Sequence, residues 1–148
     1  MSEFTESFNF KAASKENVED FIEELDIFGD VFDEENGWIT FLPAEEFNSC
    51  VEKIGRNYPG VVLYYMYTDD HGWMMNLFSN KELISKYFCD WDNELRIDNA
   101  MLNLTEFVKI LGVEEHKKDL EELFALSTLD EIFDDEQAER FAEIMQIE

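Results

Sequence analysis

The chain shows two hydrophobic repeats, the two-residue alternation of a half-buried strand and the 3.6-residue spacing of an amphipathic helix. Phe8 and Phe10 alternate with polar residues, which predicts a strand near the start of the chain. Ser14 is a residue type favoured at helix N-caps, and it predicts a helix that ends before Gly29. The apolar residues of this helix recur at helical spacing: Val18, Phe21, Ile22 and Leu25.

A hairpin and a second helix are expected next. Asn36-Gly37 is a strong turn pair, and it leads into a strand from Trp38 to Leu42. Residues 30–33 are the expected partner of that strand. A helix is expected over about residues 44–56, with Pro43 just before its start, where a missing N–H is harmless. Its apolar positions are Phe47, Cys50, Val51 and Ile54.

The middle of the chain has the strongest strand signals. Residues 61–67 are apolar on both faces, as in a central strand, and residues 73–78 are expected to pair antiparallel to them through the loop 68–72. The apolar pattern of residues 81–92 fits both a helix and a strand. Leu83, Ile84, Tyr87 and Phe88 fit a helix, whereas Leu83, Ser85, Tyr87, Cys89 and Trp91 fit a strand. We favour the helix.

From Thr105 onward the pattern is helical. Thr105 is the expected cap of the first of these helices and Gly112 its end, and Asp134 is the expected cap of the last. The apolar stripes are Phe107, Val108 and Leu111, then Leu120, Leu123, Phe124 and Leu126, then Ala138, Phe141, Ala142 and Met145. We therefore predict one α+β domain over residues 1–148, with a mainly antiparallel sheet and helices in residues 1–104 and a helical C-terminal region in residues 105–148.

Charge narrows the range of functions. The sequence has 36 acidic and 11 basic residues, a formal charge of −25. Such a surface repels nucleic-acid backbones and anionic membranes and attracts cationic surfaces. Hydrophobic residues make up 45% of the chain, enough for a folded core. Residues 1–6 are not typical of a signal peptide, and no apolar run approaches the ~20 residues of a membrane helix. We expect a cytoplasmic protein whose two cysteines are free thiols.

No motif predicts a reaction, a metal or a cofactor. His71 lies in a polar loop and His116 at the start of a helix, and neither has a second histidine at metal-binding spacing. Cys50 is expected in the core, and the carboxylate beside Cys89 disfavours a reactive thiolate there. The segment starting at Asp90 resembles a calcium loop only in its acids, because it lacks Gly at the sixth position and Glu at the twelfth.

Three dense acidic segments remain as candidate partner-binding sites. They are Asp30, Asp33, Glu34 and Glu35; Asp90, Trp91, Asp92 and Glu94; and Asp134, Asp135 and Glu136. Each could equally be a solvated surface, because most charged residues simply face water. The charge of the whole chain, however, is far above the ~2–8 units that suffice for solubility of a small domain.

In size and acidity the chain resembles the small single-domain inhibitors that bacteria make against basic nuclease toxins, although no motif is shared. This likeness implies a non-enzymatic immunity protein, monomeric or homodimeric, whose carboxylates occlude the nucleic-acid-binding surface of a basic protein. Trp91 is a candidate buried anchor. Two alternatives stay open. One is an acidic chaperone or adaptor that binds another protein through apolar surface, and the other is a small enzyme with a carboxylate-lined pocket.

Overall fold

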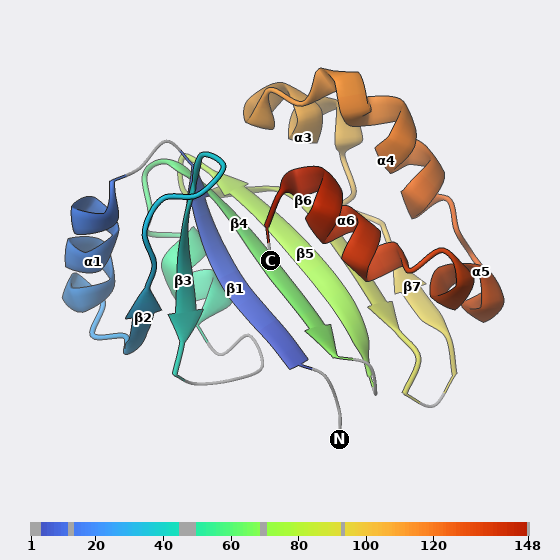
Figure 1. Ribbon diagram of the computed structural model, residues 1–148, viewed down its shortest axis with the longest axis horizontal. Coiled ribbons are helices and arrows are strands. Elements are labelled where there is room, and N and C mark those ends of the chain that lie inside the picture. The colour runs from blue at the N-terminus through green and yellow to red at the C-terminus, as the bar shows by residue number, and fades with distance from the viewer. Residues whose placement is uncertain (1–3, 12–13, 45–49, 69–70, 93, 148) are drawn as a thin grey trace.

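Seven antiparallel strands form one sheet in the computed structural model, which describes residues 4–11, 14–44, 50–68, 71–92 and 94–147 (Figure 1). The strands are β1 (Phe4–Lys11), β2 (Gly29–Val31), β3 (Trp38–Pro43), β4 (Val61–Thr68), β5 (Gly72–Ser79), β6 (Glu82–Asp90) and β7 (Arg96–Asp98). Their order across the sheet is β2-β3-β1-β4-β5-β6-β7, so the two short strands β2 and β7 form its opposite edges.

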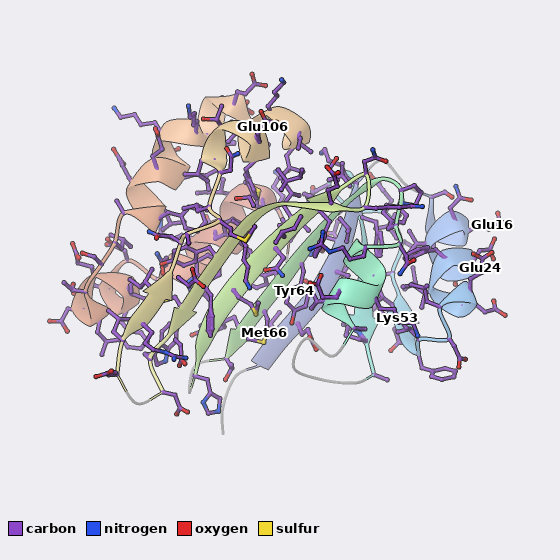
Figure 2. The ribbon with its side chains drawn as sticks, turned by 180° about the vertical axis from the view of Figure 1, so that it is seen from behind. Glu16, Glu24, Lys53, Tyr64, Met66 and Glu106 are labelled. Atoms are coloured by element: carbon purple, nitrogen blue, oxygen red, sulfur yellow. The ribbon has the colours of Figure 1, made fainter. Side chains whose placement is uncertain are left out.

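Helices cover both faces of this sheet. They are α1 (Lys15–Glu24), α2 (Val51–Gly55), α3 (Leu104–Leu111), a 3-10 turn η1 (Glu114–His116), α4 (Lys117–Phe124), α5 (Leu129–Asp134) and α6 (Gln137–Met145). Figure 1 shows the C-terminal helices over the β4–β7 side of one face, and Figure 2, from behind, shows α2 on the other. Two hydrophobic cores result, one on each face.

Alternation along each strand distributes side chains between the two cores. On β4, Leu63 and Tyr65 face the C-terminal helices, while Val62 and Tyr64 face α1 and α2. All four are buried, which confirms the predicted central strand. The antiparallel sheet and the helical C-terminal region confirm the predicted α+β class.

Local signals near the start of the chain are also confirmed. The Ser14 side chain accepts a hydrogen bond from the Asn17 N–H at 3.1 Å and caps α1. Asn36 and Gly37 have φ values of 56° and 86°, as a tight hairpin turn requires. The predicted partner of the Trp38 strand, residues 30–33, overlaps β2.

The helix expected over residues 81–92 is wrong, because β6 occupies residues 82–90. The exposed edge of β5 supplies the hydrogen-bonding partners for this segment, and a turn through Asn80 and Lys81, both with positive φ, returns the chain onto it. A register shift near Leu77 leaves one extra residue in β6, so Leu83 lies on the same face as Phe88, and Ile84 on the same face as Tyr87. These spacings of five and three residues resemble those of a helix face.

Most of the first part of the expected second helix, residues 45–49 with Phe47, lies outside the described residues; Pro43 is the last residue of β3, and α2 is described from Val51. Two later helix starts need correction. Asn103 rather than Thr105 caps α3, its side chain accepting from the Glu106 N–H at 3.1 Å. Asp134 does not cap the last helix. It ends α5, which begins after the capping residue Thr128, and α6 follows from Glu136.

Candidate functional site

The sheet order separates the three acidic segments into two regions. Residues 30–35 lie on β2 and in the hairpin after it, at one edge of the sheet. Asp90 ends β6, and Trp91, Asp92 and Glu94 follow it near the other edge, where α5 and α6 also meet at residues 134–136 (Figure 1). The Trp91 and Phe133 rings make an edge contact there, with centroids 4.9 Å apart. The structure thus brings together the second and third segments and leaves the first alone.

Several of the acids have local partners. Asp90 pairs with Arg96 at 3.1 Å, Asp92 with His71 at 3.2 Å, and Asp33 with Lys15 at 3.1 Å. Such exposed pairs are worth little in stability. Glu34 accepts a hydrogen bond from the Gly37 N–H at 2.9 Å, so this side chain supports the hairpin turn.

Trp91 is half-buried, and its ring contacts Tyr67 as well as Phe133. It therefore joins β4, β6 and α5 within the structure. Asp134, Asp135 and Glu136 are exposed at the junction of the last two helices, and Glu136 has φ of 51° there. These contacts give Trp91 a packing role and leave the first acidic segment as the stronger binding candidate.

An uncovered part of the sheet lies beside that first segment. Asp30 pairs with Leu42, and the Phe32 N–H donates to the Thr40 carbonyl at 2.9 Å, so these four side chains share one face. Phe28, whose carbonyl accepts from the Ala44 N–H at 2.8 Å, continues the row. We call the side of β2 and β3 formed by these five residues, Phe28, Asp30, Phe32, Thr40 and Leu42, the open face.

The open face exposes large apolar side chains. Phe28 is 73% exposed, Phe32 46% and Leu42 37%. Figure 1 shows the cause, because the C-terminal helices lie mainly over the β4–β7 side of this face and the end of α6 reaches β3 only at Trp38. Single exposed apolar residues are ordinary, but three on neighbouring strands form a patch of the kind that marks an interaction site.

A groove of about 860 Å³ runs from the open face to the end of α6. Its apolar lining comes from Phe32, Trp38, Leu42, Pro43, Ala44, Ala142 and Ile147. Its acidic lining comes from Glu6, Asp33, Glu35 and Glu143, and none of the described residues that line it is Lys or Arg. The Glu6 carboxylate is buried and accepts from the Tyr64 hydroxyl at 2.6 Å, so the other three acids supply the charge.

Hydrogen bonds fix both walls of this groove. The Trp38 indole N–H donates to the Met145 carbonyl at 2.8 Å, which ties β3 to the end of α6. Beside it, Thr40 donates to the Asn9 side-chain oxygen at 2.8 Å, and the Asn9 amide donates to Ser7 at 3.0 Å. These polar groups therefore have hydrogen-bond partners within the protein.

A second pocket of about 490 Å³ adjoins the groove across Trp38 and Gln146. Lys11, His116 and Arg140 line it together with Glu115 and Glu143. The His116 Nε2 is 3.9 Å from the Glu115 carboxylate, too far for the hydrogen bond that would orient a catalytic base. The described lining of this pocket mixes both signs of charge.

The thiols are poor nucleophiles. Cys50 and Cys89 are both buried, and neither forms a disulfide. Burial is the main cause that raises the pKa of Cys89, to about 11, although a hydrogen bond with Tyr87 opposes it. Among the described residues, no group of three His, Cys, Asp or Glu side chains could hold a metal ion, and no helix among them is long and apolar enough to span a membrane.

Sequence reasoning selected Asp30 on the open face and the acids Asp33 and Glu35 of the groove, but it missed the apolar residues of the open face and Glu143, which comes from α6, more than 100 residues away in the chain. A sequence signal was present for Phe28 and Phe32, because they alternate with Asp30 and so share one face of any strand through this region. No family model, curated protein or solved structure matches the chain.

Proposed function

We propose that the protein is a non-enzymatic binding protein that docks a basic protein on the open face and the groove beside it. The observation that supports this is the composition of the groove, an apolar floor with exposed carboxylates at Glu35 and Glu143, a third at Asp33 that pairs with Lys15, and no Lys or Arg in its described lining. A partner that inserts apolar side chains between Lys or Arg side chains would match it in both shape and charge.

The most concrete partner is a nuclease, whose basic surface holds nucleic-acid phosphates. Carboxylates at Asp30, Glu35 and Glu143 would pair with those Lys and Arg groups, while Phe28 and Phe32 would be buried as anchors. Binding would then block the nuclease by occlusion. The charge of −25 would accelerate the encounter with such a partner, and salt would slow it.

Reversal of charge on the open face tests this proposal. The test protein is the basic protein retained from the native host by the wild-type chain at low salt, with its nuclease activity assayed alone and in the complex. Asp30→Lys combined with Glu143→Lys should lower its affinity by at least about 100-fold, since buried charge pairs of this kind are worth about 2–5 kcal/mol.

The matched control is Glu121→Lys combined with Glu122→Lys, two exposed positions on α4. It changes the net charge equally, so both variants should lose the same part of the long-range attraction. Equal losses of affinity in the two variants would contradict docking at the open face. A partner that binds without loss of nuclease activity would contradict inhibition.

An adaptor or chaperone that binds through apolar contact is the second candidate, and the 73% exposure of Phe28 favours it. Its binding would persist in high salt, and Phe28→Ser would weaken it more than the two charge reversals do. The salt dependence of the affinity therefore separates the two candidates.

A further inference from the structure

The edge of the sheet at β2 has free backbone groups directed outward. The bonds from Phe32 to Thr40 and from Ala44 to Phe28 show that the even-numbered residues of this segment pair with β3. In an antiparallel ladder, the residues between them direct their N–H and C=O groups to the other side. Gly29 and Val31 are those residues, and their backbone groups make no hydrogen bond to other described residues.

This edge is formed by a strand of three residues, with α1 beside it (Figure 1). Gly29 is exposed, and neither proline nor lysine occurs between Phe28 and Phe32. Native edges are commonly protected by charge, by proline or by cover from a helix or loop. Here α1 packs on the opposite face, through Val18 and Ile22, and the one charge on the strand is Asp30.

The charge of the chain selects the occupant. A second copy would place Asp30, Asp33 and Glu35 against the same acids, and each copy has a net charge of −25. Like charges directly opposite across two strands are destabilising. A strand with Lys or Arg opposite Asp30 turns this repulsion into attraction, so the edge discriminates against self-association and favours a basic partner.

We propose that the bound segment of the partner adds to β2 as an extended strand, hydrogen-bonded to the backbone of Gly29 and Val31. Side chains alternate along a strand, so the segment has Lys or Arg opposite Asp30 and apolar residues two positions to either side, opposite Phe28 and Phe32. This mode of binding rests on the proposed function and specifies how the open face recognises its partner.

The probe is a capped nine-residue peptide in which Leu, Arg and Leu alternate with Thr in its centre and Lys stands at each end. Titration into the full-length protein, followed by amide hydrogen exchange, should show slower exchange at Gly29 and Val31. N-methylation of the peptide backbone on the side that faces β2 should weaken binding by about tenfold or more, because it removes the hydrogen bonds that the peptide N–H groups would donate to β2.

Val31→Pro removes the outward N–H without removing a bond to β3, and proline is tolerated at such edge positions. Val31→Ala is its matched control, since it loses the same side-chain packing and keeps the N–H. We expect Val31→Pro to bind the peptide about tenfold more weakly than Val31→Ala does. If Val31→Pro does not fold, the comparison of methylated and unmodified peptide binding to the wild-type protein is the test.

Strand addition would be overturned if Val31→Pro and Val31→Ala bound the peptide equally and the methylated peptide bound as tightly as the unmodified one. Docking on the open face would be unaffected by that result. Strand addition would also be overturned if the basic partner bound with the charge dependence described above but Gly29 and Val31 showed no protection from exchange. If neither the peptide nor any basic protein binds, the proposed function fails with it.

Discussion

The side chain of Gln137 is a buried polar junction between the sheet and the C-terminal helices, and its replacement by Met should be strongly destabilising. Its oxygen accepts from the Trp73 indole N–H at 2.9 Å, and its amide donates to the Leu123 carbonyl at 2.9 Å and to the Tyr87 hydroxyl at 3.2 Å. Gln137 is 1% exposed, so water cannot replace these bonds.

The expected cost of Gln137→Met follows from what each partner loses. The Trp73 N–H is left buried without an acceptor, which costs about 1–3 kcal/mol. The Leu123 carbonyl keeps a longer bond from the Leu126 N–H at 3.4 Å, so it loses less, and the Tyr87 hydroxyl loses one bond of about 1 kcal/mol. Met fills a similar volume, so little cavity remains. We expect a loss of about 3 kcal/mol, a large fraction of the ~5–15 kcal/mol typical of a domain.

Urea unfolding followed by far-UV circular dichroism measures this loss, because the signal does not depend on Trp73 itself. Arg140→Met on the exposed side of α6 is the control and should change the free energy of unfolding by less than about 0.5 kcal/mol. A loss below about 1 kcal/mol for Gln137→Met would refute the reasoning that these three bonds join the two layers. A changed denaturant slope would show instead that two-state unfolding has been lost.

Three further outcomes are expected. A thiol reagent at about pH 8 should label Cys50 and Cys89 only after unfolding, and fast labelling of the native protein would contradict this. Burial raises the pKa of Cys89 in the folded state, so the protonated Cys89 thiol should contribute fully to the free energy of unfolding below the ordinary pKa of cysteine. That contribution should be lost as the pH rises toward about 11. A hydrogen bond from Thr128 is the main cause that lowers the pKa of Glu131. The ionised Glu131 carboxylate therefore stabilises the fold above the ordinary pKa of glutamate, and this stabilisation is lost as the pH falls through the lowered pKa. Glu131→Gln should narrow the difference in melting temperature between about pH 6 and pH 3, and an unchanged difference would contradict this account. Added salt of about 0.5 M should raise the melting temperature at neutral pH, since it screens repulsion in a chain of charge −25, and no rise would indicate that the acids are largely paired.

The sequence alone determined the elements whose signals are local. The Ser14 cap, the Asn36-Gly37 turn and the continuous apolar run of residues 61–67 each depend on neighbours within a few positions, and each was predicted correctly. Local backbone chemistry is sufficient there, because capping and turn geometry are decided by one or two side chains.

Residues 82–90 show where local signals fail. Their apolar positions fit both periods, and the choice was made by β5, whose free edge supplies backbone partners along the whole segment. Tyr87 and Cys89 are then buried against the C-terminal layer, which the segment itself does not encode. Propensity is a weak prior when tertiary pairing offers more hydrogen bonds and more burial.

The candidate site divides in the same way. Acidity is a property of composition, so the sequence alone established a surface suited to a cationic partner. Tertiary structure decided which acids can act together, since the sheet order places residues 30–35 and 90–94 near opposite edges and moves Glu143 beside the first group. It also decided that Phe28, Phe32 and Leu42 stay exposed, because the C-terminal helices bury the β4–β7 side of that face and end before they reach β2. Burial depends on which layer reaches a residue, and that distance is set by the packing of the whole chain.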